Sequence, residues 1–215
     1  MIELVDPKIE NYCISKSTLP SKHCRTILEY TKAHVPMSQM LIGELEASFL
    51  GFLIRSIRAK RVLEIGCFTG YSALAMAERL PKDGELITLD VDPANAKLAQ
   101  SFWDKSPDGS KIKLMVGPAI ESLKKLKGKF DFVFIDADKV NYIHYLKETT
   151  RLLSAKGLVA ADNCLWGGEV LNQKSTDEGT QAIQAFNAYV QSRKNFESML
   201  VPIRDGIFLI GKRAG

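Results

Sequence analysis

The sequence lacks any long apolar stretch. None of its 215 residues belongs to a run of 18 or more apolar residues, which is roughly the length that a membrane-spanning helix needs. The first eight residues, Met1 to Lys8, are charged and contain no apolar core of the kind found in secretory signals. We therefore expect a cytoplasmic protein with neither an export signal nor a membrane partner.

Cysteine and histidine are scarce as well, at four and three residues, and the cysteines form no C-x-x-C pair. A disulfide framework and a zinc site are therefore not indicated. The charge is nearly balanced, with 29 Lys and Arg against 25 Asp and Glu. Two basic runs, at 55–61 and 124–129, fall near the ends of expected helices and contain no interleaved aromatics. They are typical of solvated helix ends rather than of a nucleic-acid surface.

From residue 61 onward, short apolar strands alternate with helices. Strands are expected at 61–65, 86–90, 112–116, 130–135 and 157–161. Helices are expected between them at 71–80, 94–105, 119–126 and 140–153. Strand and helix repeated at this spacing predict a parallel sheet with helices on both faces.

The two ends of the chain follow different patterns. The N-terminal end predicts helices at 24–32 and 38–59, the second with apolar residues at a helical period. The C-terminal end predicts a helix at 178–193, then strands at 197–201 and 207–211, joined through an Asp-Gly turn that favours an antiparallel pair.

We interpret the whole as one α/β domain over residues 1–215. It would have a helical cap region (1–59) and a Rossmann-like, doubly wound core (60–215). The core would contain a mostly parallel seven-stranded sheet with an antiparallel C-terminal strand.

Two glycines, Gly66 and Gly70, follow the first expected strand and allow the backbone to turn tightly beside a ligand. Phe68 stands where a dinucleotide-binding turn has its second glycine, which argues against NAD. Glu64 lies within the apolar strand, where a buried carboxylate needs a partner such as a cationic ligand. Asp90 ends the second strand, where a carboxylate can accept hydrogen bonds from ribose hydroxyls.

Oxygen-bearing side chains also follow the fourth and fifth strands of the predicted core. Asp136 follows the fourth strand, and Asp162 and Asn163 follow the fifth. Asp136 with Asp138 alone would often be a helix cap, and Asp162 with Asn163 alone is a frequent turn sequence. The two pairs together, one strand apart, are a more specific sign of a ligand site. Carboxylate and amide oxygens without histidine or cysteine select a hard cation, Mg²⁺ first, with Ca²⁺ or Mn²⁺ as alternatives. Three protein oxygens would leave about three places of an octahedral shell open for other ligands.

These motifs resemble those of class I S-adenosylmethionine methyltransferases. The matching segments are E-x-G-x-x-x-G-Y-S at 64–72, L-D at 89–90, F-I-D-A-D-K at 134–139 and D-N-C-L-W at 162–166. They are most similar to the cation-dependent O-methyltransferases of the caffeoyl-CoA and catechol type. The resemblance extends over roughly residues 37–212.

The resemblance implies a role for each matched residue. Asp136, Asp162 and Asn163 match the metal ligands, and Lys139 matches the residue proposed as the base in catechol-type enzymes. Contacts to S-adenosylmethionine are implied for Ile42, Glu64, Gly66, Ser72, Asp90, Ala119 and Asp138. Trp166 is expected to form a wall of the acceptor pocket. Gly167 departs from the plant members, which carry an asparagine there that contacts the phenylpropanoid substrate, so caffeoyl-CoA itself is not implied.

We therefore expect an O-methyltransferase that uses S-adenosylmethionine and a divalent cation to methylate a hydroxyl of a small, catechol-like aromatic molecule. A phenol titrates near a pKa of about 10, and a bound dication would lower that pKa and stabilise the oxyanion. A homodimer is expected because relatives are often dimers. Two alternatives remain: an O-methyltransferase acting on hydroxyuridine in tRNA, as some bacterial relatives do, and a non-catalytic module that binds a partner.

Overall fold

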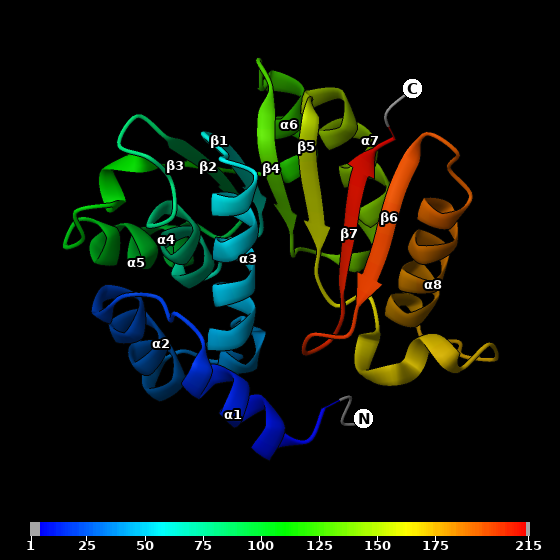
Figure 1. Cartoon of the computed structure of the whole chain (residues 1–215), viewed down its shortest axis with the longest axis horizontal. Helices are drawn as coiled ribbons and strands as arrows, with labels where there is room; N and C mark the ends of the chain where they lie inside the picture. The colour runs from blue at the N-terminus through cyan, green and yellow to red at the C-terminus, as the bar shows by residue number, and fades with distance from the viewer. Residues whose placement is uncertain (1–4, 214–215) are drawn as a thin grey trace.

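The computed structural model describes residues 5–213, and a seven-stranded sheet runs through its centre in the order β3-β2-β1-β4-β5-β7-β6 (Figure 1). The strands are β1 (Arg61–Ile65), β2 (Glu85–Asp90), β3 (Ile112–Val116), β4 (Phe130–Ile135), β5 (Leu153–Ala161), β6 (Phe196–Val201) and β7 (Ile207–Lys212). β7 is antiparallel to both of its neighbours, β5 and β6, whereas the other pairs are parallel. The predicted Rossmann-like sheet with an antiparallel C-terminal strand is confirmed.

Helices cover both faces of this sheet. The α-helices are α1 (Pro7–Lys16), α2 (Lys22–His34), α3 (Glu44–Ser56), α4 (Tyr71–Ala77), α5 (Pro93–Trp103), α6 (Ala119–Lys125), α7 (Tyr142–Leu152) and α8 (Glu178–Gln191). Short 3-10 turns are η1 (Ser38–Met40), η2 (Gly109–Lys111), η3 (Lys139–Asn141) and η4 (Trp166–Leu171). One buried cluster joins the sheet to α2, α3, α4 and α5, and a second joins it to α6, α7 and α8.

The alternation of side chains along each strand explains the two clusters. On β4, Phe132 and Phe134 enter the first cluster, whereas Val133 and Ile135 enter the second, and all four are fully buried. Successive side chains of a strand point to opposite faces, so a strand covered on both sides needs apolar residues at every position. This requirement accounts for the continuous apolar runs that the sequence shows at the strands.

The N-terminal region differs from the sequence-based prediction. The helix expected over 38–59 is interrupted, because η1 ends at Met40 and α3 begins only at Glu44. Gly43 is the extended N-cap of α3, with φ −84° and ψ 169°. Leu41 and Ile42, between the two helices, are buried, so their apolar side chains continue the helical pattern although their backbone leaves it.

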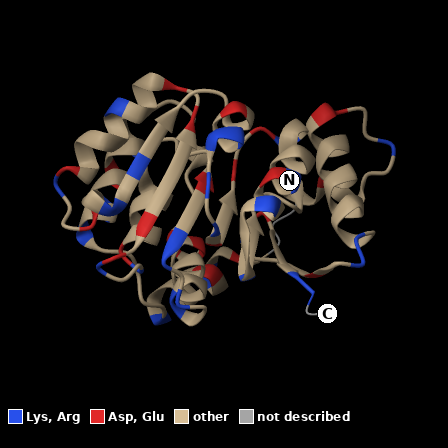
Figure 2. Ribbon diagram, turned by 90° about the horizontal axis from the view of Figure 1, so that it is seen from above, with Lys and Arg blue, Asp and Glu red and all other residues tan. Residues whose placement is uncertain are grey.

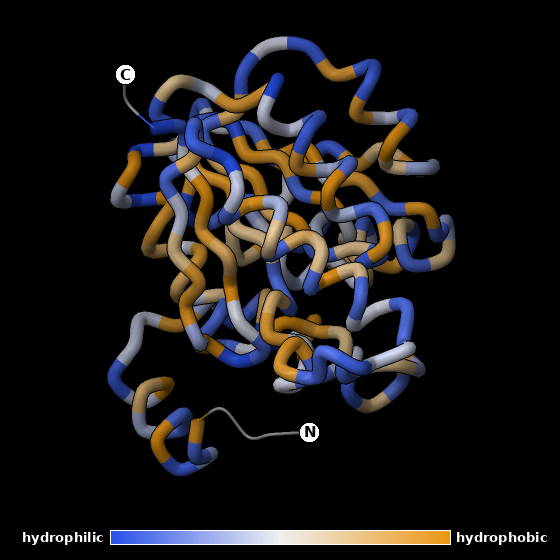
Figure 3. Tube along the Cα trace, turned by 90° about the vertical axis from the view of Figure 1, so that its right-hand side faces the viewer, coloured by the Kyte–Doolittle hydropathy of each residue, from blue (hydrophilic) through white to orange (hydrophobic). Residues whose placement is uncertain are grey.

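An additional helix, α1, precedes the expected ones and has no buried residue. Asp6 caps it by accepting a hydrogen bond from the Lys8 backbone N–H at 2.7 Å. In Figure 3 this helix stands apart from the body of the molecule, next to the N-terminal label. Its apolar residues Ile9, Tyr12 and Cys13 recur at helical spacing, but the stretch is short and Ile9 and Tyr12 remain exposed.

No helix in the described range is both long and apolar enough to cross a membrane. Residues 1–4, which belong to the segment used to predict that there is no export signal, lie outside the described residues.

Candidate functional site

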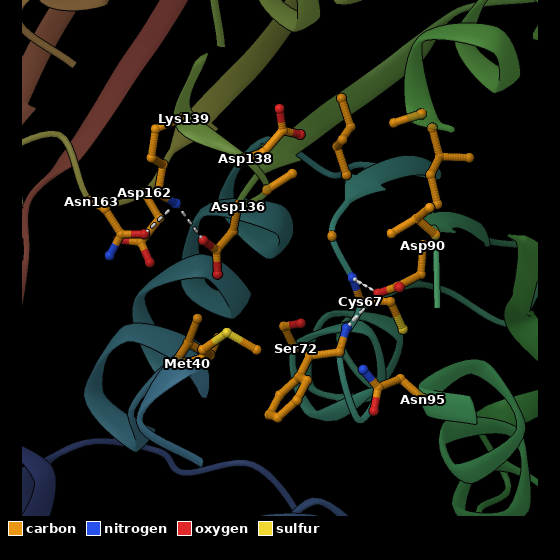
Figure 4. Close-up of a pocket in the computed structure, with 18 of the residues that line it drawn as sticks. Met40, Cys67, Ser72, Asp90, Asn95, Asp136, Asp138, Lys139, Asp162 and Asn163 are labelled. Atoms are coloured by element: carbon orange, nitrogen blue, oxygen red, sulfur yellow. Dashed lines mark hydrogen bonds and ion pairs between the residues drawn. The ribbon is translucent and has the colours of Figure 1, made fainter. Parts of the chain in front are cut away.

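A cavity of about 840 Å³ lies at the carboxyl ends of β1, β2, β4 and β5 (Figure 4). It brings together every site residue proposed from the sequence except Glu64, which is buried behind its wall. The lining includes Ile42, Gly66, Ser72, Asp90, Ala119, Asp136, Asp138, Lys139, Asp162, Asn163 and Trp166. Residues from segments more than 100 positions apart therefore face one space, as expected for ligand sites of open α/β sheets.

Asp90 closes the turn between β1 and α4. Its Oδ2 accepts hydrogen bonds from the backbone N–H groups of Cys67 at 2.9 Å and Phe68 at 2.7 Å, and Figure 4 shows both contacts. Its Oδ1 accepts from the Asp92 N–H at 2.9 Å. Asp90 thus holds the glycine turn in place as well as facing the cavity. Each carboxylate oxygen can accept more than one hydrogen bond, so capacity remains for a ligand hydroxyl.

The turn at Gly66 presses directly against the end of β4. Gly66 has φ +94°, and a Cβ atom placed there would lie 1.9 Å from the carbonyl oxygen of Asp136. Both the backbone conformation and the space require glycine. This close approach connects the glycine turn to the end of β4, which carries Asp136.

Glu64 is fully buried. Its Oε2 accepts a hydrogen bond from the Thr88 hydroxyl at 2.5 Å, and its Oε1 has no hydrogen-bond partner among the described residues. Burial raises the pKa of Glu64 to about 8, and the nearby hydroxyl groups of Ser72 and Thr88 oppose that shift. A buried carboxylate with an unpaired oxygen favours a cationic ligand group beside it.

The opposite end of the cavity carries Asp136, Asp162 and Asn163. Asp136 N–H donates to the Ile65 carbonyl at 2.9 Å and Asp162 N–H to the Ile135 carbonyl at 2.9 Å, so the parallel ladder continues one residue past each strand. This continuation places the two carboxylates at the same edge of the sheet.

Lys139 lies between these oxygens. Its Nζ donates to Asp136 Oδ1 at 3.0 Å, Asn163 Oδ1 at 2.6 Å and the Tyr142 hydroxyl at 2.7 Å, and Figure 4 shows the contacts with Asp136 and Asn163. Its Nζ is also 5.9 Å from the centroid of the Trp166 ring. Two of the three predicted metal ligands therefore already converge on one positive charge.

The electrostatics of this end favour a cation. Asp162 is 3% exposed, and burial, followed by the negative charge of Asp136, raises the pKa of Asp162 to about 7. A positive charge near both carboxylates would relieve their repulsion. The described residues contain no group of three His, Cys, Asp or Glu side chains arranged to hold a metal. The donor set is instead two carboxylates and one amide, all oxygen, which fits a hard divalent cation.

Sequence reasoning missed a partly buried ion pair beside this site. Arg204, in the turn between β6 and β7, donates from Nη1 to Glu46 Oε2 at 3.1 Å and to the Leu41 carbonyl at 3.1 Å. Glu46 is fully buried on α3, and burial, followed by the charge of Asp162, raises its pKa well above the usual range. The two residues are 158 positions apart in the sequence. The one feature of the sequence that indicated such a pair was Glu46, an acidic residue on the buried face of a helix.

The chain is similar to known methyltransferases over almost its whole length. A family model described as O-methyltransferase matches residues 15–213. The caffeoyl-CoA O-methyltransferase of Stellaria longipes is 31% identical over 217 residues, which cover 95% of this chain and 90% of that protein.

Solved structures agree. The S-adenosylhomocysteine-bound methyltransferase PaMTH1 of Podospora anserina is 29% identical, with a TM-score of 0.90 over 100% of this chain and 99% of that one. The O-methyltransferase TomG of Streptomyces achromogenes, solved with S-adenosylmethionine, is 25% identical, with a TM-score of 0.86 over 96% of each chain. Because the family model matches nearly the whole chain and the motif residues meet at one cavity, the chain belongs to the O-methyltransferase family and is an S-adenosylmethionine-dependent O-methyltransferase.

Proposed function

We propose that the protein methylates one hydroxyl of a small aromatic substrate with two vicinal hydroxyls, and that Asp136, Asp162 and Asn163 hold a divalent cation, Mg²⁺ first, for this reaction. The observation that carries the proposal is the position of Lys139 Nζ, 3.0 Å from Asp136 Oδ1 and 2.6 Å from Asn163 Oδ1. Oxygens that meet around one ammonium group are arranged to meet around a cation.

The cofactor would occupy the half of the cavity next to β1 and β2. Glu64, with its unpaired Oε1, suits the positively charged amino group of S-adenosylmethionine. Asp90 suits the ribose hydroxyls, and Ser72 and Gly66 line the same cavity. Ile42, Ala119 and Asp138 line the remaining wall and are assigned to further cofactor contacts.

The acceptor would lie next to Trp166, on the side of the cavity formed by the ends of β4 and β5. When bound, a divalent cation stabilises a phenolate and so favours loss of the hydroxyl proton. Lys139 lies within hydrogen-bond distance of the same oxygens and is assigned to receive that proton, after its own ammonium proton has passed to solvent water. The walls of the cavity would hold the substrate oxygen in line with the methyl group and the sulfur of the cofactor, the arrangement that methyl transfer requires.

The test is methyl transfer from labelled S-adenosylmethionine to a catechol and to the matching monophenol, with EDTA and after Mg²⁺ is restored. EDTA should abolish transfer to the catechol and Mg²⁺ should recover it, whereas the monophenol should react poorly throughout. Asp162→Ala should resemble the EDTA-treated enzyme while still binding S-adenosylhomocysteine. Full activity in EDTA, or equal rates on both phenols, would refute the proposed cation. Transfer to bulk tRNA but not to catechols would refute the proposed substrate class.

A further inference from the structure

Asp205, in the turn between β6 and β7, joins two loops at the edge of the site. Its Oδ1 accepts a hydrogen bond from the Gly167 backbone N–H, and its Oδ2 accepts one from Asn163 Nδ2 at 3.2 Å. Its own backbone carbonyl accepts from the Leu165 N–H at 2.8 Å. Asp205 does not line the cavity, so any influence on a ligand there passes through the residues that it contacts.

The orientation of the Asn163 amide decides whether this residue can hold a cation. An asparagine carries a carbonyl oxygen and an NH₂ group of similar size, and its neighbours determine which way each faces. A hard cation binds only the oxygen. Here Oδ1 faces the cavity, where it accepts from Lys139, and Nδ2 faces Asp205. A carboxylate only accepts hydrogen bonds, so Asp205 favours the orientation in which the NH₂ group points away from the site.

We propose that Asp205 is the positioning residue of the cation site: it directs the carbonyl oxygen of Asn163 toward the ion by accepting from the NH₂ group of the same amide. The inference rests on the proposed function, in which Asn163 is a ligand. It adds a residue with no contact to the ion, whose contribution is the orientation of its neighbour.

Asp205→Asn makes the inference testable, because the change preserves the size of the side chain. The Gly167 N–H is a fixed donor, so it keeps the carbonyl oxygen of the new asparagine on its side. The NH₂ group of that asparagine then faces Asn163 Nδ2, and two donors oppose each other. Rotation of the Asn163 amide by half a turn relieves the conflict but points NH₂ at the cation. Binding of Mn²⁺ should weaken by about 10- to 100-fold, the usual scale for such partners.

The exchanged pair, Asn163→Asp with Asp205→Asn, separates orientation from loop stability. In this double variant the asparagine at 205 donates to one oxygen of the carboxylate at 163, and the other oxygen remains free for the cation. The total charge is that of the natural protein. Mn²⁺ affinity should therefore recover to within about threefold of wild type, which a merely structural role of Asp205 would not produce.

Asn187→Ala is the matched control. Asn187 Nδ2 donates to the Cys164 carbonyl at 2.8 Å, so it supports the same loop one residue beyond Asn163 without touching the amide. This variant should unfold at a lower temperature and keep its Mn²⁺ affinity.

The experiment measures the Mn²⁺ dissociation constant by electron paramagnetic resonance, with S-adenosylhomocysteine bound. Titration calorimetry of S-adenosylhomocysteine and thermal melts confirm that each variant is folded. Weakening in Asp205→Asn with recovery in the exchanged pair supports the inference. The positioning role of Asp205 is refuted if Asp205→Asn binds Mn²⁺ as tightly as wild type, or if Mn²⁺ binding remains weak in the exchanged pair. Neither result would refute the cation site itself. If the wild-type protein does not bind Mn²⁺, the proposed cation site is refuted, and so is this inference.

Discussion

At the scale of single residues, Lys139 contacts the proposed cation ligands and is also the proposed acceptor of the substrate proton. Its ammonium group bonds to Asp136 and Asn163, so a divalent cation would compete with it for the same oxygens. Replacing Lys139 with methionine removes the competing charge and keeps most of the side-chain volume. Mg²⁺ affinity should increase, while methyl transfer should slow by about 10²–10⁴-fold if Lys139 receives the substrate proton.

Calorimetric titration with Mg²⁺ and single-turnover methyl transfer measure these two effects separately. Weaker Mg²⁺ binding in the Lys139→Met variant would mean that the lysine supports the cation site instead of competing for it. Unchanged single-turnover rates would exclude Lys139 as the proton acceptor.

Glu64 predicts a pH dependence of stability. Its pKa is about 8 in the folded protein, against an ordinary value of 4.5, because the carboxyl group is buried. Between these values the folded chain holds a proton that the unfolded chain has lost, so the free energy of unfolding falls as the pH rises. The slope from this residue is at most about 1.4 kcal/mol per pH unit. The Glu64→Gln variant cannot take up this proton. Its free energy of unfolding, measured with urea, should therefore fall less steeply between pH 4.5 and about 8.

The same proton should affect cofactor binding. A positively charged amino group beside Glu64 favours the ionised carboxylate, so S-adenosylhomocysteine should bind more tightly as the pH rises toward 8, by at most about tenfold per unit. Calorimetry in buffers of different ionisation enthalpy detects the released proton directly. If Glu64→Gln keeps the wild-type pH dependence, another group is responsible.

At the scale of elements, the turn after β1 and the end of β4 depend on each other. Gly66→Ala would place a methyl group 1.9 Å from the Asp136 carbonyl oxygen and would also require φ +94° at an alanine. We expect a loss of about 2–5 kcal/mol in the free energy of unfolding from overpacking and backbone strain together. Weaker binding should follow for both S-adenosylhomocysteine and Mn²⁺, because Asp136 must move.

Gly117→Ala is the control for backbone strain alone. Gly117 has φ +141°, and no atom lies within 4 Å of the place where its Cβ would stand. Urea denaturation should show a smaller loss in this variant, with Mn²⁺ affinity retained. Equal losses in both variants would mean that the contact between the turn and β4 contributes little.

The elements also explain what could be predicted from the sequence. The central strands β1, β2 and β4 were predicted to within one residue because burial on both faces leaves a nearly continuous apolar run at each, whereas β5 begins at Leu153 rather than at the predicted 157 because its first residues are partly exposed. The break between η1 and α3 was missed because Leu41 and Ile42 are buried in a non-helical backbone, which side-chain periodicity cannot distinguish from a helix. η4 was missed because its path depends on Gly167 and Gly168, both at positive φ.

The site was predictable to the extent that its residues follow strand ends. Asp136, Asp162 and Asn163 could be placed together because parallel strands end at one edge of the sheet. Asp205 and Glu46 could not, because only the folded chain brings the β6–β7 turn against the end of β5 and against α3. Their contacts with the site join positions that no local pattern connects.

At the scale of the whole molecule, the distribution of charge distinguishes a small acceptor from RNA. The formal net charge is only +4, and Figure 2 shows Lys and Arg interspersed with Asp and Glu along the ribbon. At the end of the cavity formed by β4 and β5, Lys139 pairs with Asp136 beside Asp162, and the nearby Arg204 pairs with Glu46, so this end is not the basic surface that a phosphate-rich substrate needs. Transfer to a catechol should therefore depend little on salt, once the Mg²⁺ concentration is fixed.

Measuring kcat/KM for a catechol between about 50 and 200 mM KCl tests this expectation, because each phosphate contact to a single strand contributes a slope of about −0.7 in log affinity against log salt. A nearly flat profile is expected for a neutral aromatic acceptor, whose binding energy would come from Trp166, the proposed cation and the apolar cavity wall. Bulk tRNA provides the comparison under identical conditions. A steep decline with salt, together with faster transfer to tRNA than to any catechol, would show that the positive charges of the surface recruit a nucleic acid and that the small-molecule assignment is wrong.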